Sequence, residues 1–149
     1  MSEIREARLQ KANSLVSKGF ASYAESFRVS HTIKFLIQKF DYLQNGQEED
    51  FCVSIAGRVM AKRVMGKIAF FTISDQEGQI QLYLDQRIIN LNLENQKLLS
   101  FEDIKEIVDI GDWIGVYGTI KKTNKGELSI KVEKWEMLSK SLQPLPDKW

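Results

Sequence analysis

The chain has 149 residues, 43% of them hydrophobic and 28% charged, which is typical of one globular domain with a small appendage. Its formal net charge is only +1, so any affinity for nucleic acid must come from local clusters of charge. One cysteine, Cys52, and one histidine, His31, exclude an intrachain disulfide and a zinc cluster built from these residue types. The charged start and the absence of an apolar run of about 20 residues predict neither a signal peptide nor a membrane span. We therefore expect a cytoplasmic protein that does not contact a membrane.

The first predicted element is a helix from about Ser2 to Lys18, with Gly19 as its stop. Its basic residues Arg5, Arg8 and Lys11 recur at three-residue spacing along one side. Such a row is either a solvated basic face or a helix that contacts phosphates, and the sequence leaves both readings open.

A second helix is predicted from a cap at Ser30 to about Leu43, because apolar residues recur there at helical spacing. The polar stretch 45–50 follows and marks the expected boundary of the main domain. The expected division is a helical arm and linker over residues 1–50, a main domain over residues 51–141 and an exit linker over residues 142–149.

Five β-strands are predicted in the main domain, because apolar residues alternate with polar ones. The first strand begins at Phe51 and bends at Gly57. A helix that opens with Ser100 and Asp103, a variant of the capping box, separates the third strand from the fourth. The alternation assigns these residues to the core: Val53, Ile55, Val59, Ala69, Phe71, Ile73, Ile80, Leu82, Leu84, Ile114, Val116, Ile120, Leu128, Ile130 and Val132.

This order of elements is that of the OB-fold, so the expected class is mainly β (α+β): a five-stranded OB-fold barrel with an N-terminal helical arm. OB-folds bind oligonucleotides across the second and third strands and with the loops that join strands one to two and four to five. In this chain those loops are residues 62–67 and 121–126, and both are basic.

The candidate binding face carries Phe70, Gln81 and Tyr83, which alternation turns away from the core. Alternation also turns Glu127, Ser129 and Lys131 of the fifth strand outward. An aromatic ring, an amide and a cluster of cations on an open sheet are typical of single-stranded nucleic acid binding. An ordinary hairpin with one exposed phenylalanine, or an OB module that binds protein, are the alternatives. The cations expected beside this face are Arg58, Lys62, Arg63, Lys67, Lys121 and Lys125.

Catalytic motifs are weak in comparison. Gly66-Lys67 lacks the earlier glycine and the following Ser or Thr of a phosphate-binding loop. His31 and Cys52 belong to different predicted elements, so a nucleophile–base pair is not expected. The sequence favours a binding module, with no catalytic residue, metal or cofactor of its own.

Three blocks of the sequence resemble the N-terminal part of class II lysyl-tRNA synthetases (lysine–tRNA ligases). They are GRVMAKRVMGKIAFFTISDQEGQIQLY (57–83), VDIGDWIGVYGTIKKTNKGELSI (108–130) and LQPLPDKW (142–149). The N-terminal arm matches more loosely, and Ser22 stands where the family usually has a proline. The GELSI block and the PLPDK exit are the parts most specific to the lysine enzyme.

The resemblance implies an anticodon-binding domain whose partner is the anticodon loop of tRNA-Lys. It implies that Phe70 stacks on the central uridine, that Gln81 reads its edge and that Arg63 lies beside the same base. Glu127 would help to read a neighbouring base. It also implies a homodimeric parent enzyme that binds ATP, magnesium and lysine in a catalytic domain beyond Trp149. We expect the isolated domain, without that catalytic domain, to be a monomer. A freestanding OB module for single-stranded nucleic acid or a protein partner stays open as the alternative.

Overall fold

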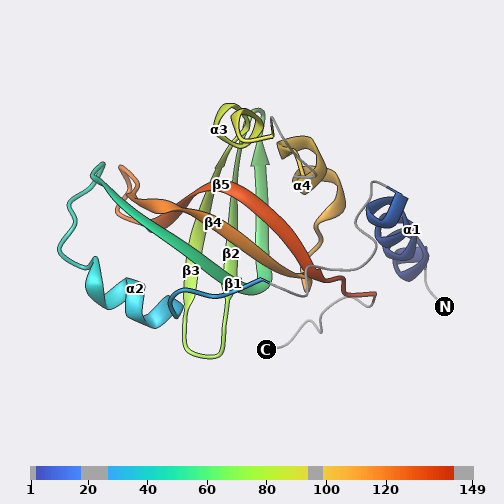
Figure 1. Ribbon diagram of the computed structural model, residues 1–149, viewed down its shortest axis with the longest axis horizontal. Helices are drawn as coiled ribbons and strands as arrows, with labels where there is room; N and C mark the ends of the chain where they lie inside the picture. Colours follow the sequence, from blue (N-terminus) through green and yellow to red (C-terminus); the bar gives the residue numbers. More distant parts are fainter. Residues whose placement is uncertain (1–2, 18–26, 94–98, 143–149) are drawn as a thin grey trace.

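The computed structural model describes residues 3–17, 27–93 and 99–142 of the chain. Five strands form one sheet that closes into a barrel in the order β1-β2-β3-β5-β4 (Figure 1). The strands are β1 (Glu48–Met65), β2 (Ile68–Ser74), β3 (Gln79–Asp85), β4 (Trp113–Lys122) and β5 (Leu128–Ser139). The helices are α1 (Glu3–Ser17), α2 (Ile33–Lys39), α3 (Gln86–Leu91) and α4 (Phe101–Ile107). The predicted OB-fold, with a helix between the third and fourth strands, is confirmed.

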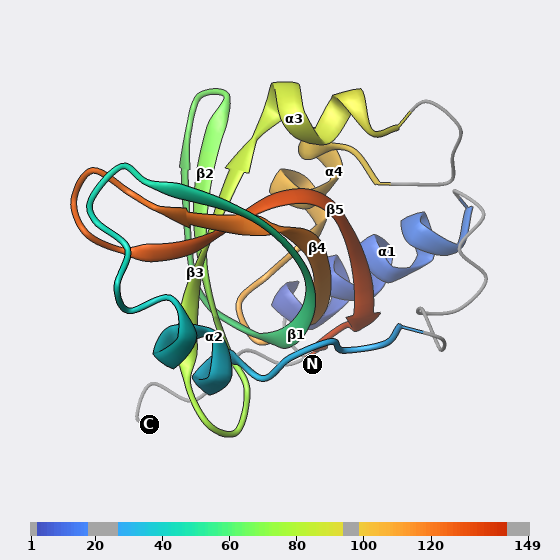
Figure 2. The same cartoon turned by 60° about the vertical axis from the view of Figure 1, so that its left-hand side comes forward.

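The barrel closes because β1 is long enough to pair with β4 along its first part and with β2 along its second (Figure 2). All neighbouring strands are antiparallel except β3 and β5, which run parallel. This parallel seam has only three residue pairs: Gln81 with Ser129, Leu82 with Ile130 and Tyr83 with Lys131. The seam therefore places Gln81 directly beside the start of β5.

The core is built from the rows of residues that alternation assigns to it. All of them are buried except Leu128, which is partly buried against the core. α2 lies at one end of the barrel and α3 and α4 lie at the other (Figures 1 and 2). Both ends are closed by apolar side chains, Ile33 and Leu36 from α2 and Phe101 and Ile104 from α4, all of them fully buried.

A β-bulge next to Met60 changes the side-chain direction along β1. The β1–β2 register shifts there, after the buried Val59. Beyond the bulge, Arg63 stands opposite the outward Phe70, and Lys62 takes the other face. A bulge adds one residue to a strand and so re-aims every side chain that follows it. Arg63 owes its place on the outer face to this bulge.

The ends of β1 differ from the prediction. The strand begins at Glu48 rather than Phe51, so part of the expected polar linker belongs to the barrel. It also continues to Met65, which leaves only Gly66 and Lys67 as the loop to β2. Gly66 has φ +66°, and a glycine at the first position of a two-residue turn suits the twist of a β-hairpin.

The helices also differ from the prediction in detail. The N-cap of α2 is Thr32, not Ser30, and the Ser30 hydroxyl instead accepts a hydrogen bond from the Ser54 N–H (2.9 Å). α3 was not predicted and begins at an Asp85 cap, whereas the capping box that opens α4 is confirmed. The predicted cap at Ser2, the stop at Gly19 and the exit linker after residue 142 lie outside the described residues.

A buried charge cluster joins α1 to the barrel. The Lys140 side chain is fully buried, and its Nζ lies 2.7 Å from Asp109 and 2.6 Å from Asp112. From α1, Lys11 Nζ lies 2.9 Å from the Asp109 carboxylate and Arg8 Nε lies 3.7 Å from it. Arg8 and Lys11 therefore pair with the protein itself, which favours a packing role for this row over a phosphate-binding one.

Candidate nucleic-acid interface

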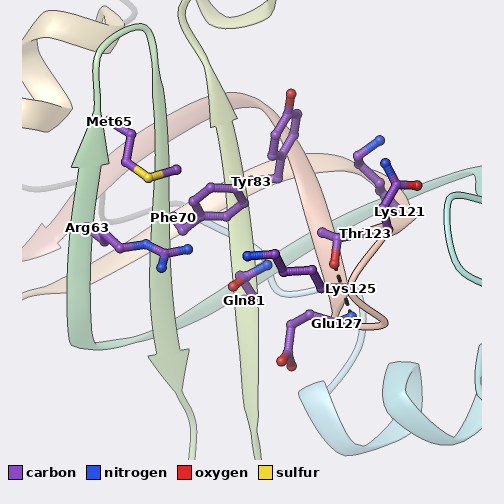
Figure 3. A pocket seen from close by; sticks show the side chains of 10 residues that line it. Arg63, Met65, Phe70, Gln81, Tyr83, Lys121, Thr123, Lys125 and Glu127 are labelled. Carbon is purple, nitrogen blue, oxygen red and sulfur yellow. Dashed lines mark hydrogen bonds between the residues drawn. The ribbon is translucent and has the colours of Figure 1, made fainter.

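A pocket of about 550 Å³ opens on the outer face of the sheet (Figure 3). β1, β2 and β3 supply one side of it, and the β4–β5 hairpin supplies the other. Its lining is aromatic, amide and cationic, with one carboxylate. The lining residues are Arg63, Met65, Phe70, Gln81, Tyr83, Lys121, Thr123, Asn124, Lys125 and Glu127.

Phe70 is the central aromatic group of the pocket. The Arg63 guanidinium carbon lies 5.0 Å from the centroid of its ring, which is a cation–π contact. The Tyr83 ring, opposite on β3, lies 5.8 Å away at an interplanar angle of 53°. Figure 3 shows Phe70 between the Arg63 and Tyr83 side chains. A half-buried ring beside a guanidinium is a suitable surface on which a nucleobase can stack.

Gln81 presents its amide to the pocket and is held from behind. Its Nε2 donates to Ser129 Oγ at 2.9 Å, and Ser129 Oγ donates to the Glu127 carbonyl at 3.2 Å. The Glu127 carbonyl also accepts from the Thr123 N–H at 3.0 Å, and the Glu127 N–H donates to Thr123 Oγ1 at 3.1 Å. The amide of β3 is thus tied to the β4–β5 hairpin by a chain of hydrogen bonds.

A Glu48 carboxylate at the start of β1 organises the cations near the hairpin. Lys131 Nζ lies 2.6 Å from it and Lys121 Nζ lies 3.1 Å from it. The hydrogen bonds from these two lysines, Lys131 first, hold the pKa of Glu48 below its usual value against the effect of burial. Lys121 Nζ also lies 5.3 Å from the Tyr83 ring centroid, so this amine is fixed at the edge of the pocket.

The structure brings six of the nine predicted site residues together in the pocket: Phe70, Gln81, Arg63, Glu127, Lys121 and Lys125. Lys67 is exposed in the β1–β2 turn and does not line the pocket. Arg58 lies on the same sheet but stands opposite Ser74, with its guanidinium carbon 5.5 Å from the Trp113 ring centroid.

The prediction that Lys62 lies beside Phe70 is wrong. Its Nζ donates to the carbonyls of Lys105 (2.6 Å) and Val108 (2.7 Å) at the end of α4. Burial lowers the pKa of this amine. The last carbonyls of a helix lack partners within the helix, and Lys62 supplies one from the barrel.

The family model of the tRNA anti-codon family, described as an OB-fold nucleic acid binding domain, matches residues 53–138. The chain belongs to this family. A lysine–tRNA ligase of Prochlorococcus marinus (strain MIT 9312) is 95% identical over all 149 residues, and one of Synechococcus sp. (strain CC9902) is 52% identical over the same length. The chain spans 29% of the length of each of these relatives. The resemblance to lysyl-tRNA synthetases that the sequence motifs indicate is confirmed.

Four residues that line the pocket are not among the nine predicted site residues: Met65, Tyr83, Thr123 and Asn124. Tyr83 lies on the outer face of β3 with Gln81, as alternation predicts, but the resemblance gives it no role in binding. Met65 also lines the pocket, and only the bulge in β1 puts it there. Ser129 takes the outer face as predicted, yet it is fully buried beneath Gln81.

Two kinds of feature do not occur in residues 3–17, 27–93 and 99–142. No helix in these ranges is long and apolar enough to cross a membrane. Nor do three or more His, Cys, Asp or Glu side chains gather there in a way that could hold a metal ion.

Proposed function

We propose that this domain binds the anticodon loop of lysine tRNA, as the anticodon-binding part of a lysine–tRNA ligase. The observation that carries the proposal is the pocket in which Phe70, Arg63 and Gln81 meet the basic β4–β5 hairpin. Membership of the anti-codon family and the names of the relatives support it. The relatives are longer than this chain, and we propose the ligation of lysine to tRNA only for a protein of their full length.

The pocket supports a simple mode of recognition. Bases of an RNA loop can turn out of the stack, lie on an aromatic ring and be read by hydrogen bonds along their edges. Here one base would stack on Phe70, beside Arg63, with its edge toward the Gln81 amide. Lys121 and Lys125 of the hairpin would contact the phosphates on either side of that base.

Binding should depend on salt through the cations of the pocket. With Lys121 and Lys125 each neutralising a phosphate, log K against log salt should fall with a slope of about −1.4. Lys125→Gln should make that slope shallower by about 0.7. Lys67→Gln is the matched control, because Lys67 is exposed but lies outside the pocket, and it should leave the slope unchanged. An anticodon stem-loop that does not bind, or binds without salt dependence, would contradict the proposal.

Gln81→Ala should reduce the preference for uridine at the central anticodon position more than it weakens binding overall. An amide that pairs with uridine rejects cytidine, because a wrong base leaves a polar group without its partner. The measurement is the affinity for stem-loops that differ only in that base. Gln79→Ala is the control, because Gln79 is exposed on the same strand and does not line the pocket. Equal affinity of the wild type for both bases, and for unrelated loops, would instead favour a general single-strand binder.

A further inference from the structure

We propose that Ser129 is a positioning residue for base specificity, because it determines which end of the Gln81 side-chain amide faces the base. The proposal rests on the proposed function, since it assigns a role behind the same pocket. Ser129 is fully buried and does not line the pocket itself. It stands beside Gln81 on the parallel β3–β5 seam. It can therefore act on a bound base only through Gln81.

The orientation follows from which atoms can donate. A backbone carbonyl can only accept, so the Ser129 hydroxyl proton must point to the Glu127 carbonyl, 3.2 Å away. The Ser129 oxygen then has only lone pairs to offer on its other side. Those lone pairs suit the Nε2 donor of Gln81, which lies 2.9 Å away.

Turning the amide round would lose a hydrogen bond in either of two ways. With the Gln81 carbonyl oxygen facing Ser129, the hydroxyl could keep its bond to Glu127 and leave two oxygen acceptors facing each other. Otherwise the Ser129 hydroxyl could donate to the Gln81 oxygen and lose its hydrogen bond to the Glu127 carbonyl. The Glu127 carbonyl cannot move with the turning hydroxyl, because it also accepts a hydrogen bond from the Thr123 N–H at 3.0 Å.

The fixed amide offers the pocket an ordered pair of groups. One Nε2 hydrogen is bound to Ser129, so the second hydrogen and the carbonyl oxygen of Gln81 remain for a base. Uridine presents an N–H donor and a C=O acceptor along its edge, which complements this pair. Cytidine presents a ring-nitrogen acceptor and an amino donor in the opposite order. Cytidine would therefore need the turned amide that Ser129 disfavours.

The test is the ratio of affinities for anticodon stem-loops with uridine or cytidine at the central position, measured on the wild type and on Ser129→Ala. Loss of one neutral hydrogen bond should lower that ratio by about 2- to 12-fold. Ser74→Ala is the matched control. The Ser74 hydroxyl also donates to a nearby backbone carbonyl, that of Asp75 at 3.0 Å, but Ser74 lies outside the pocket. Its ratio should equal that of the wild type.

Two further variants separate positioning from general damage. Ser129→Cys keeps nearly the same volume but has a much weaker donor and acceptor, so it should lower the ratio even if the alanine variant folds poorly. In a Gln81→Ala background, Ser129→Ala should change the ratio no further, because the group that it positions is gone. A further fall in that background would overturn the positioning role.

The outcomes distinguish this inference from the proposed function. A wild type that prefers uridine, with the same preference in both Ser129 variants, would overturn the role of Ser129 and leave the proposed function intact. A wild type without any preference would overturn both. A ratio that falls in Ser129→Ala and Ser129→Cys and not in Ser74→Ala would support the proposal.

Discussion

Replacing Phe70 with alanine is expected to weaken binding of the lysine anticodon stem-loop by about 1–3 kcal/mol, the range for loss of one stacked base. The Phe70 ring lies in the pocket beside Arg63 and Tyr83, and it does not belong to the buried core. The free energy of unfolding should therefore change little. Fluorescence anisotropy titrations and thermal melts measure the two effects on the same preparation.

The next residue along β2 provides the matched control. Phe71 is 1% exposed and points into the barrel, where it is among the largest fully buried side chains. Phe71→Ala should lower the free energy of unfolding by about 3–5 kcal/mol, because it leaves a cavity in the core. The affinity of the folded fraction for RNA should stay close to that of the wild type. If the two variants exchanged their effects, the register of β2 would be off by one residue.

Replacing Lys140 with methionine is expected to lower the free energy of unfolding by about 3–5 kcal/mol at pH 7, the usual effect of removing one partner of a buried ion pair. The Lys140 and Asp112 side chains are both 0% exposed, and their charged atoms lie 2.6 Å apart. Without the lysine, the Asp112 carboxylate would be buried without its cation. Urea unfolding gives the change. Lys105→Met, which breaks the more exposed pair with Glu102, is the control and should change stability by at most about 1 kcal/mol.

The deficit of Lys140→Met should shrink as the pH is lowered from 7 toward 4. Burial raises the pKa of Asp112 above its usual value, despite hydrogen bonds from the Asp109 N–H, Lys140 and the Ser141 N–H. A folded-state pKa above the unfolded one favours the native state at low pH, and that stability is lost as the pH rises. Removing Lys140 should raise this pKa further. A deficit that stays constant or grows on acidification would contradict the assignment.

Asp109 should also make the stability difference between the wild type and Lys140→Met smaller at low pH. Burial raises its pKa, but the hydrogen bonds from Lys140 and Lys11 outweigh burial and hold the pKa below its usual value. In the wild type this contribution to stability is lost as the pH falls through the lowered pKa. The variant has less of it to lose, so the two proteins should converge at low pH.

Alternation was sufficient to place Phe70 and Gln81 on the outer face, because successive side chains of a half-buried strand must point to opposite sides. Alternation alone could not place Lys62 or Arg63, because the bulge at Met60 shifts the rest of β1 by one residue. A bulge depends on how two strands pair, and neither strand alone contains a signal for it. Gly57, where the first strand was expected to bend, lies three residues before the change of register.

Sequence patterns could not predict that Ser129 is buried, nor that α3 exists. Ser129 is covered because β5 pairs in parallel with β3, a contact between strands that are distant in the chain. α3 spans only Gln86–Leu91, which is too short to show a helical period, and its cap at Asp85 sits at the end of a strand. Local patterns predicted the rows of the core, while long-range pairing decided which polar groups meet behind the pocket.

The pocket is complete only after the barrel has closed, because its two sides meet at the three-pair seam between β3 and β5. Gln81 and Ser129 are 48 positions apart, so their contact forms only when two separately paired parts of the chain are brought together. Contacts of this kind are slow to form, because loop closure must precede them. A half-folded or nascent chain therefore has the aromatic ring of β2 without the hydrogen bonds from Gln81 to Ser129 and from Ser129 to Glu127. RNA that binds across the completed seam would in turn stabilise the closed barrel, since a ligand that binds only the native state stabilises that state by mass action.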